Sequence, residues 1–254
     1  MEKQNFMDAN SPAGNDRTHA PWIRFLEASR RYCTDHPGLF FPLKCFDERV
    51  NRLKIRKDSD LLLEGFPRSG NTFSVVAFEH LQGRELGNGH HLHTIAHIRR
   101  AIRFGKPILI VIRNPEDVVT SASLRMETKD FAVPLVRYIH YHQGLQALTD
   151  HFVLATFEEF LKNPVPAIHA VNRKFGTSFK ARPLGEEDRL AIRKKMEEIK
   201  EDMGLGEMAA SLPSDAKNKV KEEYLAVITA RHADLLAQAR DIYEKLSMLA
   251  KDQG

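Results

Sequence analysis

The segment at residues 61–73, LLLEGFPRSGNTF, contains the most informative pattern in the chain. Its first three residues form a short unbroken apolar run, which is typical of a strand buried on both faces. The run leads into Gly65, and residues 71–81 have the composition of a helix. A strand, a glycine-containing turn and a helix start direct backbone N–H groups and the positive end of the helix dipole toward one point. The segment therefore predicts an anion-binding loop at the end of a buried strand.

The loop differs from the phosphate loop of nucleoside triphosphatases in the placement of its cation. Gly65 and Gly70 have the spacing of the glycines in GxxxxGK[ST], and Thr72 stands at the Ser/Thr position. Asn71 replaces the lysine that reaches the outer phosphates, while Arg68 adds a cation inside the loop. We expect this loop to bind ATP or GTP poorly and to hold one terminal anionic group through Arg68. The alternative is a structural corner in which glycine and proline serve only the geometry of the turn.

A second apolar run, at residues 107–112, leads into Arg113 rather than into an acidic residue. In triphosphate-hydrolysing enzymes of this architecture, the corresponding strand usually ends in Asp, which holds magnesium. Arg113 would instead repel a metal ion and attract a phosphate directly. A helix that starts near Pro115 places Ser121 one to two turns further on, close enough to share a phosphate with Arg113. The alternatives are a surface ion pair for Arg113 and a hydrogen bond from Ser121 to its own helix backbone.

Apolar runs alternate with helical patterns through the central part of the chain. A third run lies at residues 152–155, and helical spacing occurs at Phe131, Leu135, Tyr138, His142 and Leu145. This alternation predicts an α/β fold with a P-loop-like central parallel sheet flanked by helices. Both anion sites would then lie at the carboxyl edge of the sheet, where ligands of such folds bind.

The chain becomes charged and helical after Gly185, which predicts a helical C-terminal region. Its expected apolar faces are Ile192, Met196, Ile199 and Met203 in one helix, and Leu235, Ala239, Ile242, Leu246 and Leu249 in the last helix.

Composition favours one globular domain. The chain has 254 residues, of which 42% are hydrophobic and 28% charged, and its formal net charge is +4. We expect a single domain at residues 21–254 after a flexible tail at residues 1–20. The mild positive charge suits an anionic ligand. Because the lysines and arginines form no long block, we expect no nucleic-acid partner.

Cysteine usage and hydropathy predict a cytoplasmic protein. Cys33 and Cys45 form neither a CxxC pair nor a zinc-ligand pattern, so we interpret them as reduced thiols. No apolar run is long enough to span a bilayer, and the first 19 residues lack the apolar core of a signal peptide. We therefore expect no transmembrane segment.

The two predicted anion-binding motifs make residues 58–165 resemble the family of sulfotransferases that use 3′-phosphoadenosine-5′-phosphosulfate (PAPS). The segment PRSGNT at residues 67–72 is similar to the family's 5′-phosphosulfate loop. The segment RNPED at residues 113–117, with Ser121, is similar to its 3′-phosphate motif, and FEEFLKNP at residues 157–164 is similar to a third segment. The resemblance implies a P-loop-like α/β fold, PAPS as donor, 3′-phosphoadenosine-5′-phosphate (PAP) as product and no metal ion.

The resemblance also implies the residues of the donor site. The expected donor-binding residues are Arg68, Ser69, Gly70, Asn71, Thr72, Phe73, Arg113 and Ser121. Phe157 stands where the family often has Tyr, and Phe73 where it often has Trp. The family's C-terminal Arg-Lys-Gly-x-x-Gly segment is not recognisable. Lys217, Lys219 or Lys221 could supply cations in its place, or could belong to a solvated helix face.

A cluster of histidines between the two anion motifs supplies candidates for a catalytic base. The segment GHHLHTIAH at residues 89–97 holds four of the 12 histidines, and His is the usual base near neutral pH. His91, followed by Leu92, fits the family's catalytic His-Leu step best, with His93 second and His90 third. The alternative is a zinc site at His93 and His97, although no acidic or Cys ligand accompanies them.

The predicted function is transfer of a sulfuryl group from PAPS to a hydroxyl or an amine of a small molecule, glycan or lipid, with Arg68 stabilising the leaving oxygen. A nucleotide kinase or NTPase with a degenerate loop, and a non-catalytic PAPS- or phosphate-binding module, are the alternatives. We expect the acceptor pocket to be formed by the chain before Leu61 and after Gly185. Phe40, Phe41 and Phe46 could line it, with core packing as the default interpretation. The sequence leaves the oligomeric state open.

Overall fold

The computed structural model describes residues 21–204 and 215–253, and the side chains of residues 28–204 and 218–253. The tail predicted at residues 1–20 lies outside this range. The described part contains a four-stranded sheet in the order β2-β1-β3-β4, in which every adjacent pair is parallel. Its strands are β1 (Leu61–Glu64), β2 (Asn88–Gly89), β3 (Ile108–Ile112) and β4 (Val153–Thr156). The predicted α/β class is therefore confirmed.

The apolar runs at residues 61–63, 107–112 and 152–155 all form the strands predicted for them. Their side chains are buried on both faces, because successive residues of a strand point to opposite sides of the sheet. Leu61 and Leu63 pack into one core cluster, whereas Leu62 packs into the other. Strand β2 was not predicted, since two residues of Asn and Gly carry no apolar pattern.

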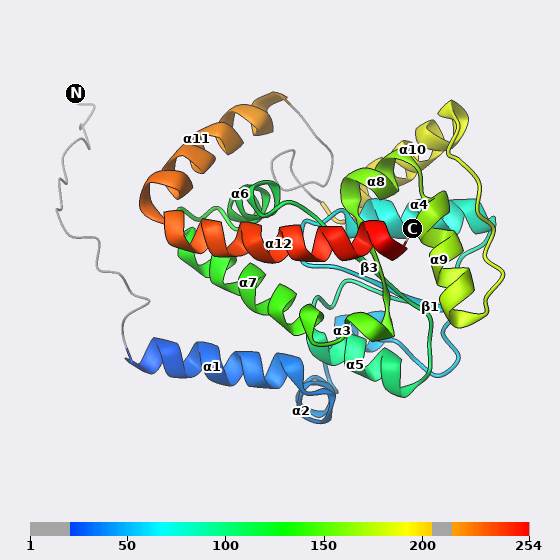
Figure 1. Cartoon of the computed structure of the whole chain (residues 1–254), viewed down its shortest axis with the longest axis horizontal. Coiled ribbons are helices and arrows are strands. Elements are labelled where there is room, and N and C mark those ends of the chain that lie inside the picture. Colours follow the sequence, from blue (N-terminus) through cyan, green and yellow to red (C-terminus); the bar gives the residue numbers. More distant parts are fainter. Residues whose placement is uncertain (1–20, 205–214, 254) are drawn as a thin grey trace, which may run out of the picture.

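Helices cover both faces of the sheet (Figure 1). One layer consists of α4 (Asn71–Gln82), α8 (Phe157–Lys162), α9 (Val165–Phe175) and α10 (Glu186–Asp202). The other consists of α5 (Ile95–Arg103), α6 (Pro115–Arg125), α7 (Ala132–Gln146), α11 (Asp215–Arg231) and α12 (Ala233–Gln253). A short 3-10 helix, η2 (Thr149–His151), precedes β4.

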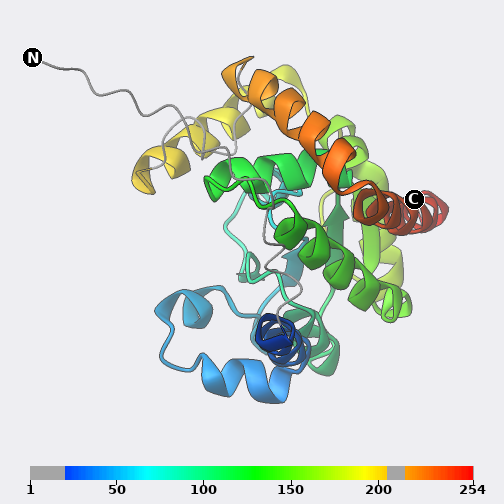
Figure 2. The same ribbon diagram turned by 90° about the vertical axis from the view of Figure 1, so that its left-hand side faces the viewer.

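The N-terminal helices lie at one end of the molecule. They are α1 (Pro21–Asp35), α2 (Pro37–Leu43) and α3 (Glu48–Leu53). Figures 1 and 2 show α1 and α2 at the bottom of both views and α11 at the top. Phe40 and Phe41 join a small apolar cluster in this region, whereas Phe46 is 96% exposed. Core packing is thus the role of the first two phenylalanines.

The C-terminal helices follow the predicted apolar faces with two corrections. Met203 is 59% exposed because α10 ends before it, and Leu249 is 39% exposed. On α12 the buried stripe instead ends at Ala250, one position further along the same helix. The remaining residues of this stripe are Leu236, Ala239, Ile242 and Leu246.

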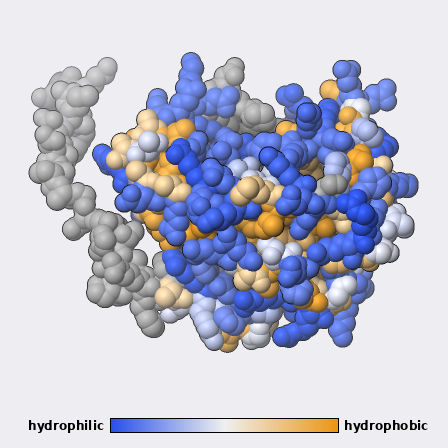
Figure 3. Space-filling model, viewed as in Figure 1, coloured by the Kyte–Doolittle hydropathy of each residue, from blue (hydrophilic) through white to orange (hydrophobic). Residues whose placement is uncertain are grey.

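The exposed surface is mostly hydrophilic on the face that carries α12, with apolar side chains in small separate groups (Figure 3). No helix in residues 21–204 or 215–253 is long and apolar enough to cross a bilayer. Cys33 and Cys45 are both free thiols, as predicted.

The first loop glycine is required by a close approach of two backbone segments. A Cβ atom added to Gly65 would overlap the carbonyl oxygen of Val111 in β3 and would lie 2.8 Å from Oδ1 of Asn71. Backbone atoms of a buried sheet have little room to move. Gly65 therefore allows the chain to leave β1 while still in contact with β3.

We expect Gly65→Ala to destabilise the protein by about 3 kcal/mol, because a methyl group forced into a packed site displaces its neighbours. Chemical unfolding would measure the loss. Gly38→Ala is the matched control, since a Cβ at Gly38 meets nothing within 4 Å. Equal stability of the two variants would contradict the close approach of β1 and β3.

A buried histidine in α7 makes the stability of this core sensitive to acid. Nδ1 of His142 donates to the carbonyl of Tyr138 at 2.8 Å, and its ring stacks on the ring of Tyr138. Burial lowers the pKa of His142 from 6.5 to about 4. The unfolded chain therefore binds a proton at a higher pH than the folded chain does.

We expect the free energy of unfolding to fall as pH drops from 6.5 to 4, because protonation of His142 then favours the unfolded state. In His142→Asn the fall should be smaller by roughly 1–3 kcal/mol. The exposed His151 provides the control variant, His151→Asn, which should follow the wild type. If the free energy of unfolding of His142→Asn changed with pH as that of the wild type does, this role of His142 would be contradicted.

Candidate active site

The loop at residues 65–70 connects β1 to α4 and has a left-handed backbone at two positions. Arg68 has φ 72° and Gly70, the N-cap of α4, has φ 87°. Gly70 packs so tightly against the ring of Phe157 that any Cβ there would overlap the ring. A non-glycine residue with positive φ is uncommon and is often found at functional positions. Arg68 thus has a left-handed backbone conformation that is uncommon for residues other than glycine.

Asn71, at the position of the usual lysine, contributes to the loop rather than reaching outward. Its Nδ2 donates to the carbonyl of Phe66 at 2.9 Å. Its Oδ1 and the hydroxyl of Ser69 are buried without a hydrogen-bond partner among the described residues. Buried polar groups are normally paired, so two unpaired ones beside a helix N-terminus are consistent with a ligand site.

The two anion motifs meet at Arg68 and Ser121. Nε of Arg68 donates to Oγ of Ser121 in α6 at 2.8 Å. Burial lowers the pKa of Arg68 to about 10, and the positive charges of Arg125 and Arg113 contribute. Arg68 therefore stays protonated at neutral pH, with two further guanidinium groups near it.

Arg113 lies at the end of β3, as predicted, with acidic partners on two elements. Its Nη2 is 3.2 Å from Oδ2 of Asp117, and its Nε is 3.7 Å from Oε1 of Glu158. The guanidinium lies 4.8 Å from the ring centroid of Phe157, and the hydroxyl of Tyr138 donates to the Arg113 carbonyl at 2.8 Å. The Arg113 side chain is therefore oriented from several sides.

Of the three lysines considered, Lys221 reaches this site. Its Nζ lies 3.6 Å from Oδ1 of Asp117. Burial lowers the pKa of Lys221, and Arg113 and Arg68 lower it further, while Asp117 opposes this. Lys219 is exposed, and the side chain of Lys217 lies outside the described residues.

The site thus has more positive than negative charge. Its cations are Arg68, Arg113, Arg125 and Lys221, facing the carboxylates of Asp117 and Glu158. Arg125 was not predicted. It lies one turn after Ser121 on α6, a spacing that places two residues on one helix face and could have indicated it.

The aromatic positions of the two motifs also come together. Phe73 of α4 and Phe157 of α8 pack edge to face, with ring centroids 6.0 Å apart. Thus Phe157, which the sequence placed in a third motif, touches both the loop at Gly70 and the guanidinium of Arg113.

The histidine segment lies directly beside the loop. Nε2 of His91 is 3.2 Å from Oγ1 of Thr72, and Nδ1 of His91 is 2.6 Å from Nδ1 of His90. Burial lowers the pKa of His91 to about 3, and the neighbouring His90 and His93 act in the same direction. His91 is therefore a neutral imidazole at physiological pH.

A buried carboxylate that sequence reasoning missed organises the rest of this segment. Glu64, the last residue of β1, is fully buried and accepts hydrogen bonds from the backbone N–H of Leu92 at 2.8 Å and of His93 at 3.3 Å. Burial opposes its ionisation, but hydrogen bonds from His93 and His97 hold the pKa of Glu64 well below its usual range. Its only sequence signal was a charge that ends an apolar strand.

The zinc alternative at His93 and His97 finds no support in the described residues. Nε2 of His97 accepts the N–H of Ile55 at 2.7 Å, so its Nδ1 carries the proton and donates to Glu64 at 2.8 Å. Both nitrogens of His97 are thus occupied within the protein. No group of three or more His, Cys, Asp or Glu side chains in the described part of the chain could hold a metal ion.

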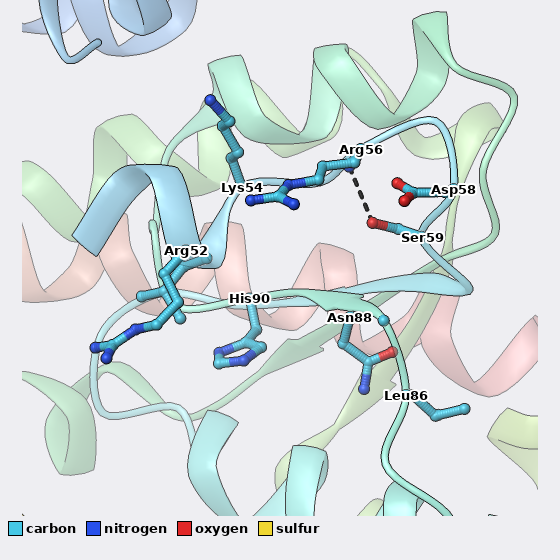
Figure 4. Close-up of a pocket in the computed structure, with 10 residues that line it drawn as sticks. Arg52, Lys54, Arg56, Asp58, Ser59, Leu86, Asn88 and His90 are labelled. Carbon is cyan, nitrogen blue, oxygen red and sulfur yellow. Dashed lines mark hydrogen bonds between the residues drawn. The ribbon is translucent and has the colours of Figure 1, made fainter. Parts of the chain in front are cut away.

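A hollow of about 570 Å³ lies next to β2, and neither Arg68 nor Arg113 lines it. His90 and Asn88 line it together with residues before Leu61, among them Arg52, Lys54 and Arg56 (Figure 4). In Figure 4 the Lys54 side chain points away from His90, and its Nζ donates to Asn51 at 2.6 Å. No residue after Gly185 lines this hollow, and the acceptor pocket expected from residues before Leu61 and after Gly185 stays a prediction.

Comparison with known proteins adds little at the level of sequence. No family model matches the chain, and no curated protein matches it. Among solved structures, the chain is similar to mouse sulfotransferase SULT7A1 complexed with PAP, with 12% sequence identity and a TM-score of 0.41. The match covers 78% of this chain and 92% of that chain. A likeness this distant assigns neither residues nor chemistry to the chain described here.

Proposed function

We propose that this protein transfers a sulfuryl group from PAPS to a hydroxyl or an amine of an acceptor. One observation carries the proposal: Arg68 of the loop donates to Ser121, on the helix that follows Arg113. The two motifs predicted to bind anions therefore lie side by side at the carboxyl edge of a parallel sheet. A nucleotide with phosphoryl-type groups at both its 5′ and 3′ positions is a ligand that uses both motifs at once.

The residues at this edge suit the two ends of such a donor. Backbone N–H groups of residues 69–72 and the start of α4 would hold the 5′-phosphosulfate, together with Arg68 and Thr72. The unpaired polar atoms of Ser69 and Asn71 are available there. Arg113, Ser121 and Lys221 would hold the 3′-phosphate. Phe157 contacts both Gly70 and the Arg113 guanidinium, and it would, with Phe73 packed on it, offer an aromatic face for the purine.

Sulfuryl transfer resembles phosphoryl transfer in that positioning and charge stabilisation do most of the catalytic work. Arg68 would stabilise the charge that develops on the leaving oxygen of the 5′-phosphate. A base must also take the acceptor proton, and His91 and His93 are the candidates within the histidine segment. Both lie beside the loop that would hold the donor.

Features of the site favour this reaction over a nucleotide kinase or NTPase. The side chain at the lysine position, Asn71, is bonded to the loop carbonyl of Phe66. The strand that would carry a magnesium-binding Asp ends in Arg113. A non-catalytic PAPS-binding module would retain the phosphate contacts, so the test needs both a binding and a transfer measurement.

Calorimetry with PAP tests the donor site. We expect a Kd in the micromolar range for the wild type. Arg113→Ala should weaken binding by ~2–4 kcal/mol, roughly a 30- to 700-fold higher Kd, because it removes one partner of a buried charged contact. The matched control is Arg193→Ala, on the exposed face of α10, which should bind PAP as the wild type does.

A transfer assay separates the alternatives. With ³⁵S-labelled PAPS and a panel of phenols, alcohols and amines, label should move to an acceptor, and slowly to water, without added magnesium. Equal PAP affinity in Arg113→Ala would remove the 3′-phosphate assignment. PAP binding without any transfer would favour the binding module, and magnesium-dependent turnover of ATP would favour the kinase.

A further inference from the structure

We propose that His93, rather than His91, takes the proton of the acceptor, and that Glu64 is the positioning residue that holds His93 in place. This inference rests on the sulfuryl transfer proposed above, and it concerns which side chains of the histidine segment carry out one step of it. It differs from the sequence-based preference for His91, which came from the family resemblance, through its spacing from Arg113 and the His-Leu pattern.

His91 and His93 differ in how many of their ring nitrogens are already hydrogen-bonded. His91 is occupied at both of them, by Thr72 at 3.2 Å and by His90 at 2.6 Å. His93 uses only Nδ1, which lies 2.7 Å from the carbonyl oxygen of Gly65 and must donate to it. No described residue hydrogen-bonds Nε2 of His93, so this nitrogen carries a lone pair that is free to accept a proton.

The His93 ring is also held next to the loop that would bind the donor. Gly65 is the first residue of the loop that would hold the donor, so the hydrogen bond from Nδ1 ties the His93 ring to that loop. The His93 side chain is 16% exposed, which lets an acceptor reach Nε2 while the ring stays fixed by packing. The rings of His91 and His93 pack edge to face with centroids 5.6 Å apart.

The negative charge of Glu64 favours protonation of His93. When His93 accepts a proton it becomes a cation, and Oε2 of Glu64 lies 3.4 Å from its Nδ1. A carboxylate in this position stabilises the imidazolium, as the Asp does in the Ser-His-Asp arrangement, while the Gly65 carbonyl fixes the tautomer of the neutral ring. Among the described residues, the ring of His91 is hydrogen-bonded to Thr72 and His90 and to no carboxylate, and burial beside His90 and His93 disfavours its charged form.

Glu64 also holds the backbone that carries His93. His91 and His93 both have left-handed backbones, with φ 56° and 54°. For residues other than glycine this conformation costs energy and persists only where the surroundings impose it. The N–H groups of Leu92 and His93 donate to Glu64 at 2.8 and 3.3 Å, which fixes the segment in this conformation.

The proton step balances with these residues alone. The acceptor O–H proton moves to Nε2 of His93 while the acceptor oxygen forms a bond to sulfur. The bond between sulfur and the bridging oxygen breaks, and its electron pair stays on the 5′-phosphate of PAP beside Arg68. The imidazolium keeps its Nδ1–H on the Gly65 carbonyl and faces Glu64. It later releases the new proton to water, which restores the resting state.

The decisive experiment compares His93→Asn, His91→Asn and Glu64→Gln in the ³⁵S assay, with water and with the best acceptor of the panel. We expect kcat to fall about 100- to 10,000-fold in His93→Asn, the range of a lost general base, and less than about 10-fold in His91→Asn. Glu64→Gln should lower kcat about 10- to 100-fold. The Kd for PAP should change less than about threefold in all three variants.

Two further measurements separate positioning by Glu64 from general stability. With phenols of increasing acidity as acceptors, the defect of Glu64→Gln should shrink, because an acidic phenol needs little help to lose its proton. Glu79→Gln, a half-buried carboxylate of α4 that bonds Asn88, is the matched control and should keep wild-type kcat. A defect that is the same for all phenols would overturn the positioning role.

A variant that fails to fold does not remove the test, because the wild-type chain can be probed directly. Diethyl pyrocarbonate modifies histidine nitrogens that have a free lone pair, and peptide mass spectrometry resolves each site. His93 should react at least about tenfold faster than His91. Faster reaction of His91, or loss of transfer in His91→Asn with transfer kept in His93→Asn, would overturn this inference alone. If the wild type neither binds PAP nor transfers the label, the proposed function falls, and this inference falls with it.

Discussion

The hydrogen bond from Arg68 to Ser121 is the contact on which the rest of this site depends. It joins side chains 53 positions apart in the sequence, one in the loop after β1 and one on the helix after β3. The two strands are neighbours in the sheet and run parallel, so their carboxyl ends open at the same edge. The close approach at Gly65 keeps the loop against β3, and Phe157, at the start of α8 after β4, packs against both Gly70 and the Arg113 guanidinium. Positive charge gathers there because the sheet topology brings three chain segments to one place.

Glu64 connects this edge of the sheet to the histidine segment at residues 89–97. A buried carboxylate is costly unless it is fully hydrogen-bonded, and this one accepts hydrogen bonds from the backbone N–H groups of three residues and from His97. Its position at the end of β1 links the strand that starts the anion loop to the histidine segment after β2. The proposed donor binding and proton transfer would therefore depend on adjacent residues, Glu64 at the end of β1 and Gly65 directly after it, which favours a fixed distance between the two sites.

Much of this architecture could be predicted from sequence because it depends on local patterns. The buried strands appear as apolar runs, and the anion loop appears as glycines and a cation at a fixed spacing. Strand β2 could not be predicted because its two residues form a strand only through their pairing with β1. Glu64 and Arg125 were missed, and Lys221 could not be selected from the three candidate lysines, for a related reason: each acquires its role from partners far away in the chain. Similarly, the choice between His91 and His93 depends on which ring nitrogens are already bonded, and this follows only from the folded geometry.

The most direct test of the central claim is a crystal structure of the protein with PAP. We expect one nucleotide to span the edge of the sheet, with its 5′-phosphate on the loop at residues 67–72 and its 3′-phosphate on Arg113 and Ser121. Arg68 would then lie between the two phosphates and exchange its bond to Ser121 for the ligand. Density for PAP in a different cleft, or with only one phosphate in contact with these residues, would contradict it.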